Sequence, residues 1–210
     1  MKKIKAYIIN RNLLSSLKDT VVFLQKEKRI EIIIYDIQST YIPLLEYYNS
    51  LKDIKIIYND ANVGPHSIWR LQEEFIEDNY IITDSDCDYS KVPNDWLNVL
   101  LTTIEQVEVN KVGFSLEINN LPNTIITKDV INHESQFWVN KNKFGWLSDI
   151  DTTFSLYRKG KGFCYSAIRL DRPYTIKHIP WYIKIPNEEW QYYIDNVSNV
   201  STWWNIFKNK

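Results

Sequence analysis

Hydrophobic positions along the first 90 residues alternate between two kinds of segment. Short runs rich in β-branched residues predict strands, and longer segments with apolar residues on one face predict helices. The predicted strands are residues 4–10, 30–36, 54–58 and 80–84, and the predicted helices are residues 14–27, 42–51 and 67–77. This alternation is typical of βαβ units, so we expect an α/β fold with a mainly parallel sheet flanked by helices.

The pattern changes in the second half of the chain. A helix over residues 96–108 and a strand over residues 112–118 are still predicted, but the regular alternation fades from Asn120 onward. This part holds six of the eight tryptophans, and no Gly/Ser-rich linker separates it from the first half. We therefore expect a single domain over residues 1–210, in which residues 91–210 form an α+β extension of the Rossmann-like residues 1–90.

Composition narrows the range of partners. Lys and Arg (25) nearly balance Asp and Glu (26), so the net charge of -1 excludes the basic surface that nucleic-acid binding requires. No apolar run reaches the ~20 residues of a transmembrane helix, and two distant cysteines indicate a reducing compartment. We expect a cytoplasmic protein; Trp203 and Trp204 leave open a peripheral contact with a membrane interface.

Polar side chains follow the predicted strands where each strand ends. Asp84 and Asp86 come directly after the strand of residues 80–84. Asn10, Arg11, Asp36 and Asn62 follow the earlier strands. In open α/β sheets the carboxyl ends of the strands form the ligand site, and carboxylates there bind Mg²⁺ or Mn²⁺ together with substrate phosphates. A plain turn, in which the aspartates bond backbone amides, remains an alternative. An EF-hand is excluded because Tyr89 replaces its glycine and Asp95 its final glutamate.

Several motifs together resemble the GT-A-fold glycosyltransferases, in particular the family-2-like group of small bacterial and viral enzymes. The residues that carry the resemblance are Ile8-Ile9-Asn10-Arg11-Asn12, Tyr35-Asp36-Ile37-Gln38-Ser39-Thr40, Asn62-Val63-Gly64-Pro65, Thr83-Asp84-Ser85-Asp86, Asp149-Ile150-Asp151-Thr152-Thr153-Phe154 and Lys177-His178-Ile179-Pro180-Trp181-Tyr182. They cover most of the chain. The resemblance implies a metal-dependent enzyme that moves a sugar from a nucleoside-diphosphate sugar, of the UDP or GDP type, to a carbohydrate acceptor in surface or capsular glycan synthesis.

The resemblance also implies roles for individual residues. Residues 1–90 would bind the nucleotide and residues 91–210 the acceptor. Asp86 would ligate Mn²⁺ or Mg²⁺, Asp84 would contact the ribose or a metal-bound water, and His178 would be a third ligand. Asn10, Arg11 and Asp36 would hold the base and ribose, with Asn62 close by, although Asp36-Ile37-Gln38-Ser39 departs from the usual Asp-Gly-Ser.

The transfer chemistry needs a base for the acceptor hydroxyl. Asp151 is the candidate, with Asp149 as the alternative two residues away. On a strand the two carboxylates would share one face, whereas at a helix start either would serve as a cap. A base at Asp151 favours inversion over retention. Trp181 either lines the sugar-binding site or packs in the core.

Two other functions remain open. A nucleotidyltransferase shares the sheet and an acidic metal site, but it normally carries a Gly-rich phosphate loop near the first strand. This chain has five glycines, none before Gly64. A non-catalytic sugar- or nucleotide-binding module is the second alternative.

Three other residues that could carry chemistry have simpler expected roles. We expect His66 and His133 on helix surfaces or at helix caps, and Cys87 as a small buried residue that fills space in the core.

Overall fold

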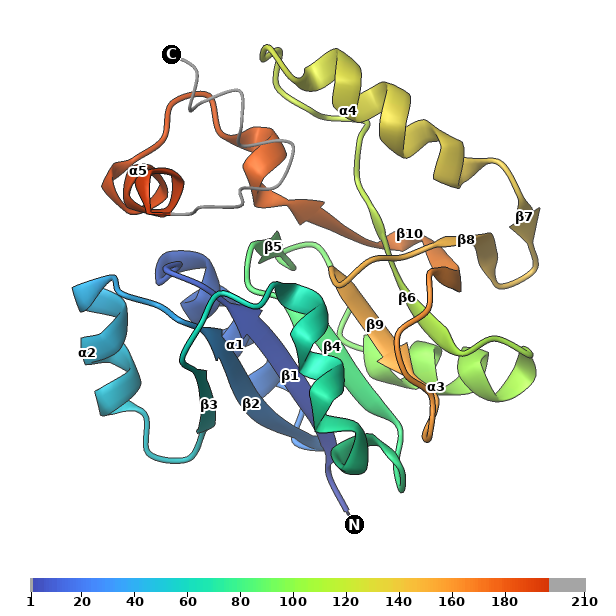
Figure 1. Ribbon diagram of the computed structural model, residues 1–210. Coiled ribbons are helices and arrows are strands. Elements are labelled where there is room, and N and C mark those ends of the chain that lie inside the picture. Colours follow the sequence, from blue (N-terminus) through green and yellow to red (C-terminus); the bar gives the residue numbers. More distant parts are fainter. Residues whose placement is uncertain (1, 197–210) are drawn as a thin grey trace.

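The computed structural model describes residues 2–196, and within them a ten-stranded sheet runs through the whole chain (Figure 1). The strand order is β3-β2-β1-β4-β9-β6-β10-β8-β7, with β5 paired to β10. The first four strands are β1 (Ile4–Asn10), β2 (Ile30–Ile37), β3 (Lys55–Asn59) and β4 (Tyr80–Asp84), and their neighbours pair in parallel. The predicted α/β fold is therefore confirmed.

Helices cover both faces of the parallel strands, which explains why these strands are apolar on both sides. The helices α1 (Ser15–Gln25), α2 (Ile42–Ser50) and α3 (Trp96–Gln106) contribute to one core, which contains Ala6 and Ile8 of β1. On the opposite face, Tyr7 and Ile9 pack with the helical segment η1 (Pro65–Phe75). In Figure 1, η1 lies in front of β1 and α1 lies behind it.

The segment η1 corrects one prediction of secondary structure. We expected an α-helix over residues 67–77, but the segment is 3₁₀-helical and breaks at Leu71, whose φ of -82° and ψ of 35° are not helical. Its start is set by Gly64, at a φ of 73°, and by Pro65, whose ring fixes the first helical φ. The segment consists of short turns that place Trp69 and Phe75 on the sheet.

The second half adds antiparallel strands to the sheet, as expected of an α+β extension. The strand β9 (Phe154–Tyr157) pairs antiparallel with both β4 and β6 (Lys111–Leu116). The long strand β10 (Ser166–His178) pairs with β6, β8 (Gly145–Asp149) and β5 (Cys87–Asp88), and β7 (Lys141–Asn142) lies beyond β8. The remaining helical segments are α4 (Thr127–Glu134), η2 (Ser135–Trp138), η3 (Ile179–Tyr182) and α5 (Glu188–Asp195).

Strand order places a switch point between β1 and β4. From β1 the chain proceeds outward through β2 and β3, and then returns to the other side of β1 as β4. Ligands of open α/β sheets bind at the carboxyl ends of the strands at such a point. Over the part of the chain that is described, no helix has the length and apolar character needed to cross a bilayer. Trp203 and Trp204 lie outside that part.

Candidate functional site

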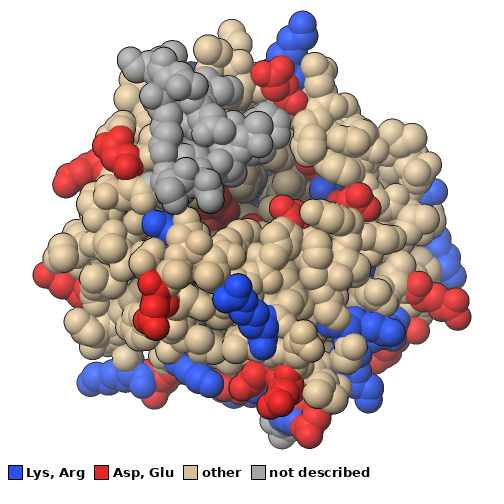
Figure 2. Space-filling view, in the orientation of Figure 1, with Lys and Arg blue, Asp and Glu red and all other residues tan. Residues whose placement is uncertain are grey.

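A cavity of about 860 Å³ opens at the carboxyl ends of β1 and β4. Of the site residues predicted from the sequence, all but one line it: Asn10, Arg11, Asn62, Asp84, Asp86, Asp149, Asp151, His178 and Trp181. These residues come from both halves of the chain. Figure 2, drawn in the orientation of Figure 1, shows acidic side chains gathered in a hollow near the centre of this face.

Arg11 brings a half-buried cation to the cavity. Its Nη2 donates to the carbonyl of Asn196 at 3.2 Å, while its Nε and Nη1 are buried and have no hydrogen-bond partner among the described residues. Burial lowers the pKa of this guanidinium, but arginine remains charged at neutral pH. Two unsatisfied donors on a charged group are costly, so the geometry fits an anionic ligand.

Asp36 is the predicted residue that does not line the cavity. Its carboxylate is buried. One oxygen accepts a hydrogen bond from the Ser39 amide (2.9 Å) and the other from the Tyr48 hydroxyl (2.9 Å), so both oxygens already have a partner within the protein. The Tyr48 hydroxyl in turn accepts a bond from Asn10 Nδ2 at 2.8 Å, and Ser85 Oγ donates to Asn10 Oδ1 at 2.6 Å. Asp36 thus orients Asn10 through Tyr48, in place of the direct ligand contact that we expected.

The two carboxylates after β4 face different partners. Asp84 Oδ2 accepts a hydrogen bond from Thr152 Oγ1 at 2.7 Å. Burial raises the pKa of the Asp84 carboxyl well above its usual range, and the charges of Asp86 and Asp151 raise it further. Asp86 Oδ2 lies 3.3 Å from His178 Nε2. The like charges of Asp84, Asp86 and Asp151 repel one another, so this group of carboxylates favours binding of either a proton or a cation.

Strand pairing explains why His178 lies beside Asp86. The antiparallel ladder between β5 and β10 places His178 opposite Cys87, and the Ile179 amide donates to the Asp86 carbonyl at 2.8 Å. Trp181 follows in η3 and packs its ring edge-on against His178, with centroids 4.9 Å apart. Residues 92 positions apart in sequence, from Asp86 to His178, are thereby brought to one side of the cavity.

The side chains of Asp86 and His178 suit a cation that is held partly by the protein and partly by a bound substrate. Between residues 2 and 196, no group of three or more His, Cys, Asp and Glu side chains is arranged to hold a metal ion by itself. Asp86 Oδ1 and His178 Nδ1 are nevertheless buried and lack a hydrogen-bond partner within this range. Mg²⁺ and Mn²⁺ are commonly bound by one or two carboxylates together with substrate phosphates, so these residues fit such a shared site.

The candidate base is carried by the loop between β8 and β9. Asp149 ends β8, and Asp151 follows in the loop with its side chain 58% exposed. Asp151 Oδ1 lies 3.6 Å from His66 Nε2. His66 lies exposed in the first turn of η1, as expected of a helix-surface residue. It also lines the cavity, and its ring contacts Trp69 and Phe163. An acid and an imidazole therefore face each other across the two halves of the chain.

A buried ion pair that no sequence motif indicates lies in the cavity wall. Glu134 at the end of α4 accepts from Arg169 of β10, and both side chains are nearly inaccessible. Burial raises the pKa of Glu134 to about 6, although Arg169 opposes this. The guanidinium also stacks over Phe137 and donates to the Asp149 carbonyl at 2.5 Å. Neither residue belongs to a motif, and a long-range contact of this kind leaves no local signal.

The position of Cys87 agrees with the expected role. Its side chain is fully buried, Sγ lies 3.6 Å from the Thr153 carbonyl oxygen, and burial raises the thiol pKa well above its usual range. A thiolate nucleophile needs the opposite environment, with a lowered pKa and access to solvent. Cys87 is therefore a filler beneath the site.

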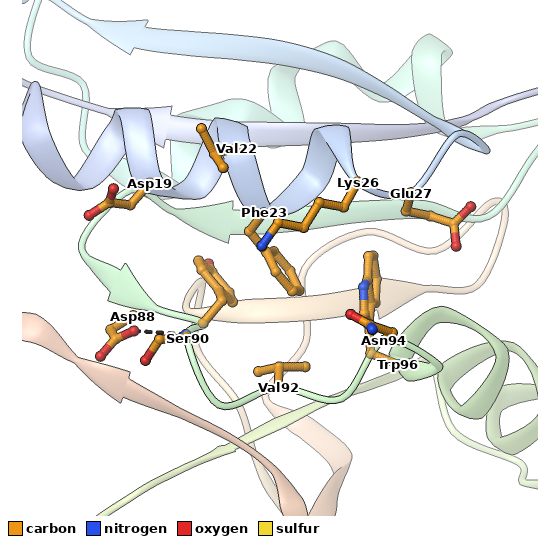
Figure 3. A pocket seen from close by; sticks show the side chains of 11 residues that line it. Asp19, Val22, Phe23, Lys26, Glu27, Asp88, Ser90, Val92, Asn94 and Trp96 are labelled. Atoms are coloured by element: carbon orange, nitrogen blue, oxygen red, sulfur yellow. Dashed lines mark hydrogen bonds between the residues drawn. The ribbon is translucent and has the colours of Figure 1, made fainter.

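A second cavity, of about 680 Å³, lies between α1 and the segment of residues 88–96 (Figure 3). Phe23 and Trp96 form its inner wall, and both are buried core residues. Charged side chains of both signs surround it, including Lys26 and Glu27. The carboxylate of Asp88 already accepts a hydrogen bond from the Ser90 amide. None of the predicted site residues line this cavity, so the larger cavity is the candidate functional site.

Comparison with known proteins identifies no family. No protein-family model and no curated protein matches the sequence. Among solved structures, S. aureus TarS 1-349 superposes with a TM-score of 0.47 and 13% identity, over 74% of this chain and 47% of that one, so this chain spans about half of its length. A 4-diphosphocytidyl-2C-methyl-D-erythritol synthase gives a TM-score of 0.48 and 8% identity over 92% and 97% of the two chains. The same synthase from Anaerococcus prevotii DSM 20548 gives 0.48 and 9% over 93% and 99%. Likenesses this weak assign no activity to the chain.

Proposed function

We propose that this protein is a glycosyltransferase that binds a nucleoside-diphosphate sugar with Mn²⁺ or Mg²⁺ and transfers the sugar to a carbohydrate acceptor. The observation that supports it best is the pair of unsatisfied, oppositely charged groups in one cavity. Within the described chain, Arg11 Nε and Nη1 and Asp86 Oδ1 are buried without partners. A diphosphate that carries a divalent cation satisfies both, because guanidinium binds phosphate oxygens and carboxylate binds the cation.

Asp86 would hold the cation, with His178 beside it, and Asp84 lines the same cavity. When bound, the cation neutralises the negative charge that develops on the leaving diphosphate. Asn10 and Asn62 lie near the same strand ends and would contact the nucleoside. The side chain of Asn10 is already oriented by Tyr48 and Ser85, which favours a fixed rather than an adaptable contact.

Asp151 would act as the base of an inverting transfer. The acceptor hydroxyl oxygen forms a bond to the anomeric carbon, the bond from that carbon to the diphosphate oxygen breaks, and the hydroxyl proton moves to the Asp151 carboxylate. The nucleoside diphosphate leaves with the bonding electron pair. His66, 3.6 Å from Asp151, is placed to share the proton. Asp149 remains the second candidate, because it lines the same cavity.

The acceptor would lie against the wall built by the second half of the chain. Phe137, Tyr165 and Trp181 line the cavity there, and flat aromatic faces pack against the C–H faces of sugars. The buried pair of Arg169 and Glu134 adds polar groups to this wall. A role in surface or capsular glycan synthesis rests on the family resemblance alone.

The loop after β1 argues against a nucleotidyltransferase. Such an enzyme normally wraps the phosphates in a glycine-rich loop, whereas here Asn10, Arg11 and Asn12 precede α1 and no glycine occurs before Gly64. The side chain of Asn12 accepts from the Thr40 and Tyr41 amides, so this loop is fastened to the start of α2.

A thermal-shift panel tests the proposal. UDP, GDP, dTDP, CDP and CTP are each added with Mn²⁺ and with EDTA to the wild-type protein and to Asp86→Asn. We expect one nucleoside diphosphate to raise Tm only with Mn²⁺ and only in the wild type, because a ligand that binds the folded state stabilises it by mass action. A shift given by CTP alone favours the nucleotidyltransferase. No shift with any nucleotide would contradict the proposal.

A further inference from the structure

Lys111, the first residue of β6, is a fully buried lysine. Such burial is rare because an ammonium group loses its hydration, and it is normally offset by a carboxylate partner. Among the contacts that residues 2–196 provide, the hydrogen-bond partners of this ammonium are uncharged oxygens. A methionine or leucine at this position would avoid the free-energy cost of desolvating the ammonium, so the buried charge indicates a specific role for Lys111.

The contacts of Lys111 point at one loop. Its Nζ donates to the Ile150 carbonyl at 2.6 Å, to the Tyr157 hydroxyl at 3.0 Å and towards the Asp151 carbonyl at 3.4 Å. It also stands over the rings of Tyr157 and Phe163, with 4.9 and 5.4 Å to their centroids. Ring faces and carbonyl oxygens both carry negative charge density, so they replace part of the lost hydration.

The loop that Lys111 contacts is the one that carries the candidate base. Neighbouring parts of the loop are fastened by other groups: the Ile150 amide donates to the Tyr165 carbonyl (2.9 Å), Thr152 Oγ1 donates to Asp84 (2.7 Å), and Thr83 Oγ1 donates to the Thr153 carbonyl (2.6 Å). The carbonyls of Ile150 and Asp151 both face Lys111 at the start of β6. The Lys111 ammonium therefore contacts the backbone that sets the direction of the Asp151 side chain.

We propose that Lys111 is a positioning residue, which fixes the backbone at Ile150 and Asp151 so that the Asp151 carboxylate faces the cavity. The catalytic part of this inference rests on the proposed function of Asp151. Its structural part, that the ammonium rather than the lysine stem orders the loop, stands by itself. Burial lowers the pKa of Lys111 to about 8, in agreement with an ammonium held by neutral oxygens.

Hydrogen exchange tests the structural part without any substrate. Lys111→Met keeps the apolar stem and removes the donors, and the exposed Lys55→Met of β3 is the matched control. We expect amides of residues 150–153 to exchange at least tenfold faster in Lys111→Met, with β1 and β2 unchanged and Tm not lowered. Unchanged exchange of residues 150–153 would overturn the inference. Should Lys111→Met fail to fold, Lys111→Gln, which is shorter and uncharged, is read by the same criterion.

Kinetics test the catalytic part with a donor that the wild type uses. We expect Lys111→Met to lower kcat of transfer at least tenfold while KM for the donor stays within twofold, since the donor side of the cavity does not contact Lys111. Wild-type kcat in Lys111→Met would overturn the positioning role even if transfer itself is established. If the wild type neither binds nor turns over any donor, the proposed function fails, and the exchange experiment still decides whether the ammonium orders the loop.

Discussion

The buried ammonium of Lys111 predicts an unusual dependence of stability on pH. Its pKa is lowered by burial from 10.5 to about 8 in the folded protein. Between these values the unfolded chain binds more protons than the folded one, so the free energy of unfolding rises with pH. Below about pH 8 Lys111 is charged in both states, and the folded protein lacks the stability that deprotonation of the buried amine provides. The perturbation that isolates this effect is Lys111→Met, which has no proton to lose.

The size of the effect follows from the two pKa values. Linkage gives a rise of about 1.4 kcal/mol between pH 7 and pH 9, and about 2.5 kcal/mol by pH 10. Buried tyrosines such as Tyr48, whose pKa is raised by burial, act in the opposite direction at high pH. They are common to both proteins, and the difference between wild type and Lys111→Met removes their contribution.

The assay is urea unfolding at pH 7, 8, 9 and 10 for both proteins, with Lys55→Met as the control. The wild type is expected to gain about 2.5 kcal/mol relative to Lys111→Met across this range. The Lys55→Met protein should follow the wild type, because Lys55 is exposed. A difference between wild type and Lys111→Met that stays flat from pH 7 to pH 10 would contradict a lowered pKa of Lys111, since it would mean that the ammonium is as well solvated as in the unfolded chain.

Three further substitutions probe the cavity. Arg11→Gln is expected to weaken binding of the cognate nucleoside diphosphate, by calorimetry, about tenfold or more, because charge-assisted hydrogen bonds are worth about 1.5–3 kcal/mol; an equal effect of the exposed Arg70→Gln would argue against a specific contact. Asp151→Asn is expected to lower transfer by about 100-fold or more while donor binding is kept, and near-normal transfer would remove Asp151 as the base. Arg169→Met is expected to lower the free energy of unfolding by about 3 kcal/mol, because it leaves the Glu134 carboxylate buried without its partner. Urea unfolding measures this loss, which adding Glu134→Gln should largely restore; a loss below about 1 kcal/mol would contradict a buried charge pair.

The parallel half of the fold was predictable because its signals are local. Runs of β-branched residues between amphipathic segments placed β1, β2, β3 and β4 to within a residue or two, and the polar residues that follow them came to one sheet edge as expected. Parallel strands buried on both faces have little freedom of arrangement. The class of fold and the place of the site follow from this.

The parts that could not be predicted depend on distant contacts. Asp36 is a strand-end carboxylate like Asp84, yet the hydroxyl of Tyr48 folds over it from α2 and removes it from the cavity. His66 of η1 lies 3.6 Å from Asp151, which is 85 positions further along the chain, and no local pattern predicts that contact. The buried Lys111 lies in an apolar strand pattern, and its partners are two backbone carbonyls, which every sequence contains, and the hydroxyl of the distant Tyr157.

The proposed function requires a cation at Asp86 that activates a nucleoside-diphosphate sugar. Its most direct test measures release of the nucleoside diphosphate from UDP-, GDP- and dTDP-sugars, with Mn²⁺ and with EDTA, for the wild type, Asp86→Ala and the control Asp88→Asn, which alters an aspartate two residues away that does not line the cavity. We predict release with one donor class, lost in EDTA and in Asp86→Ala but kept in Asp88→Asn. Release that is unaffected by both EDTA and Asp86→Ala would contradict the account.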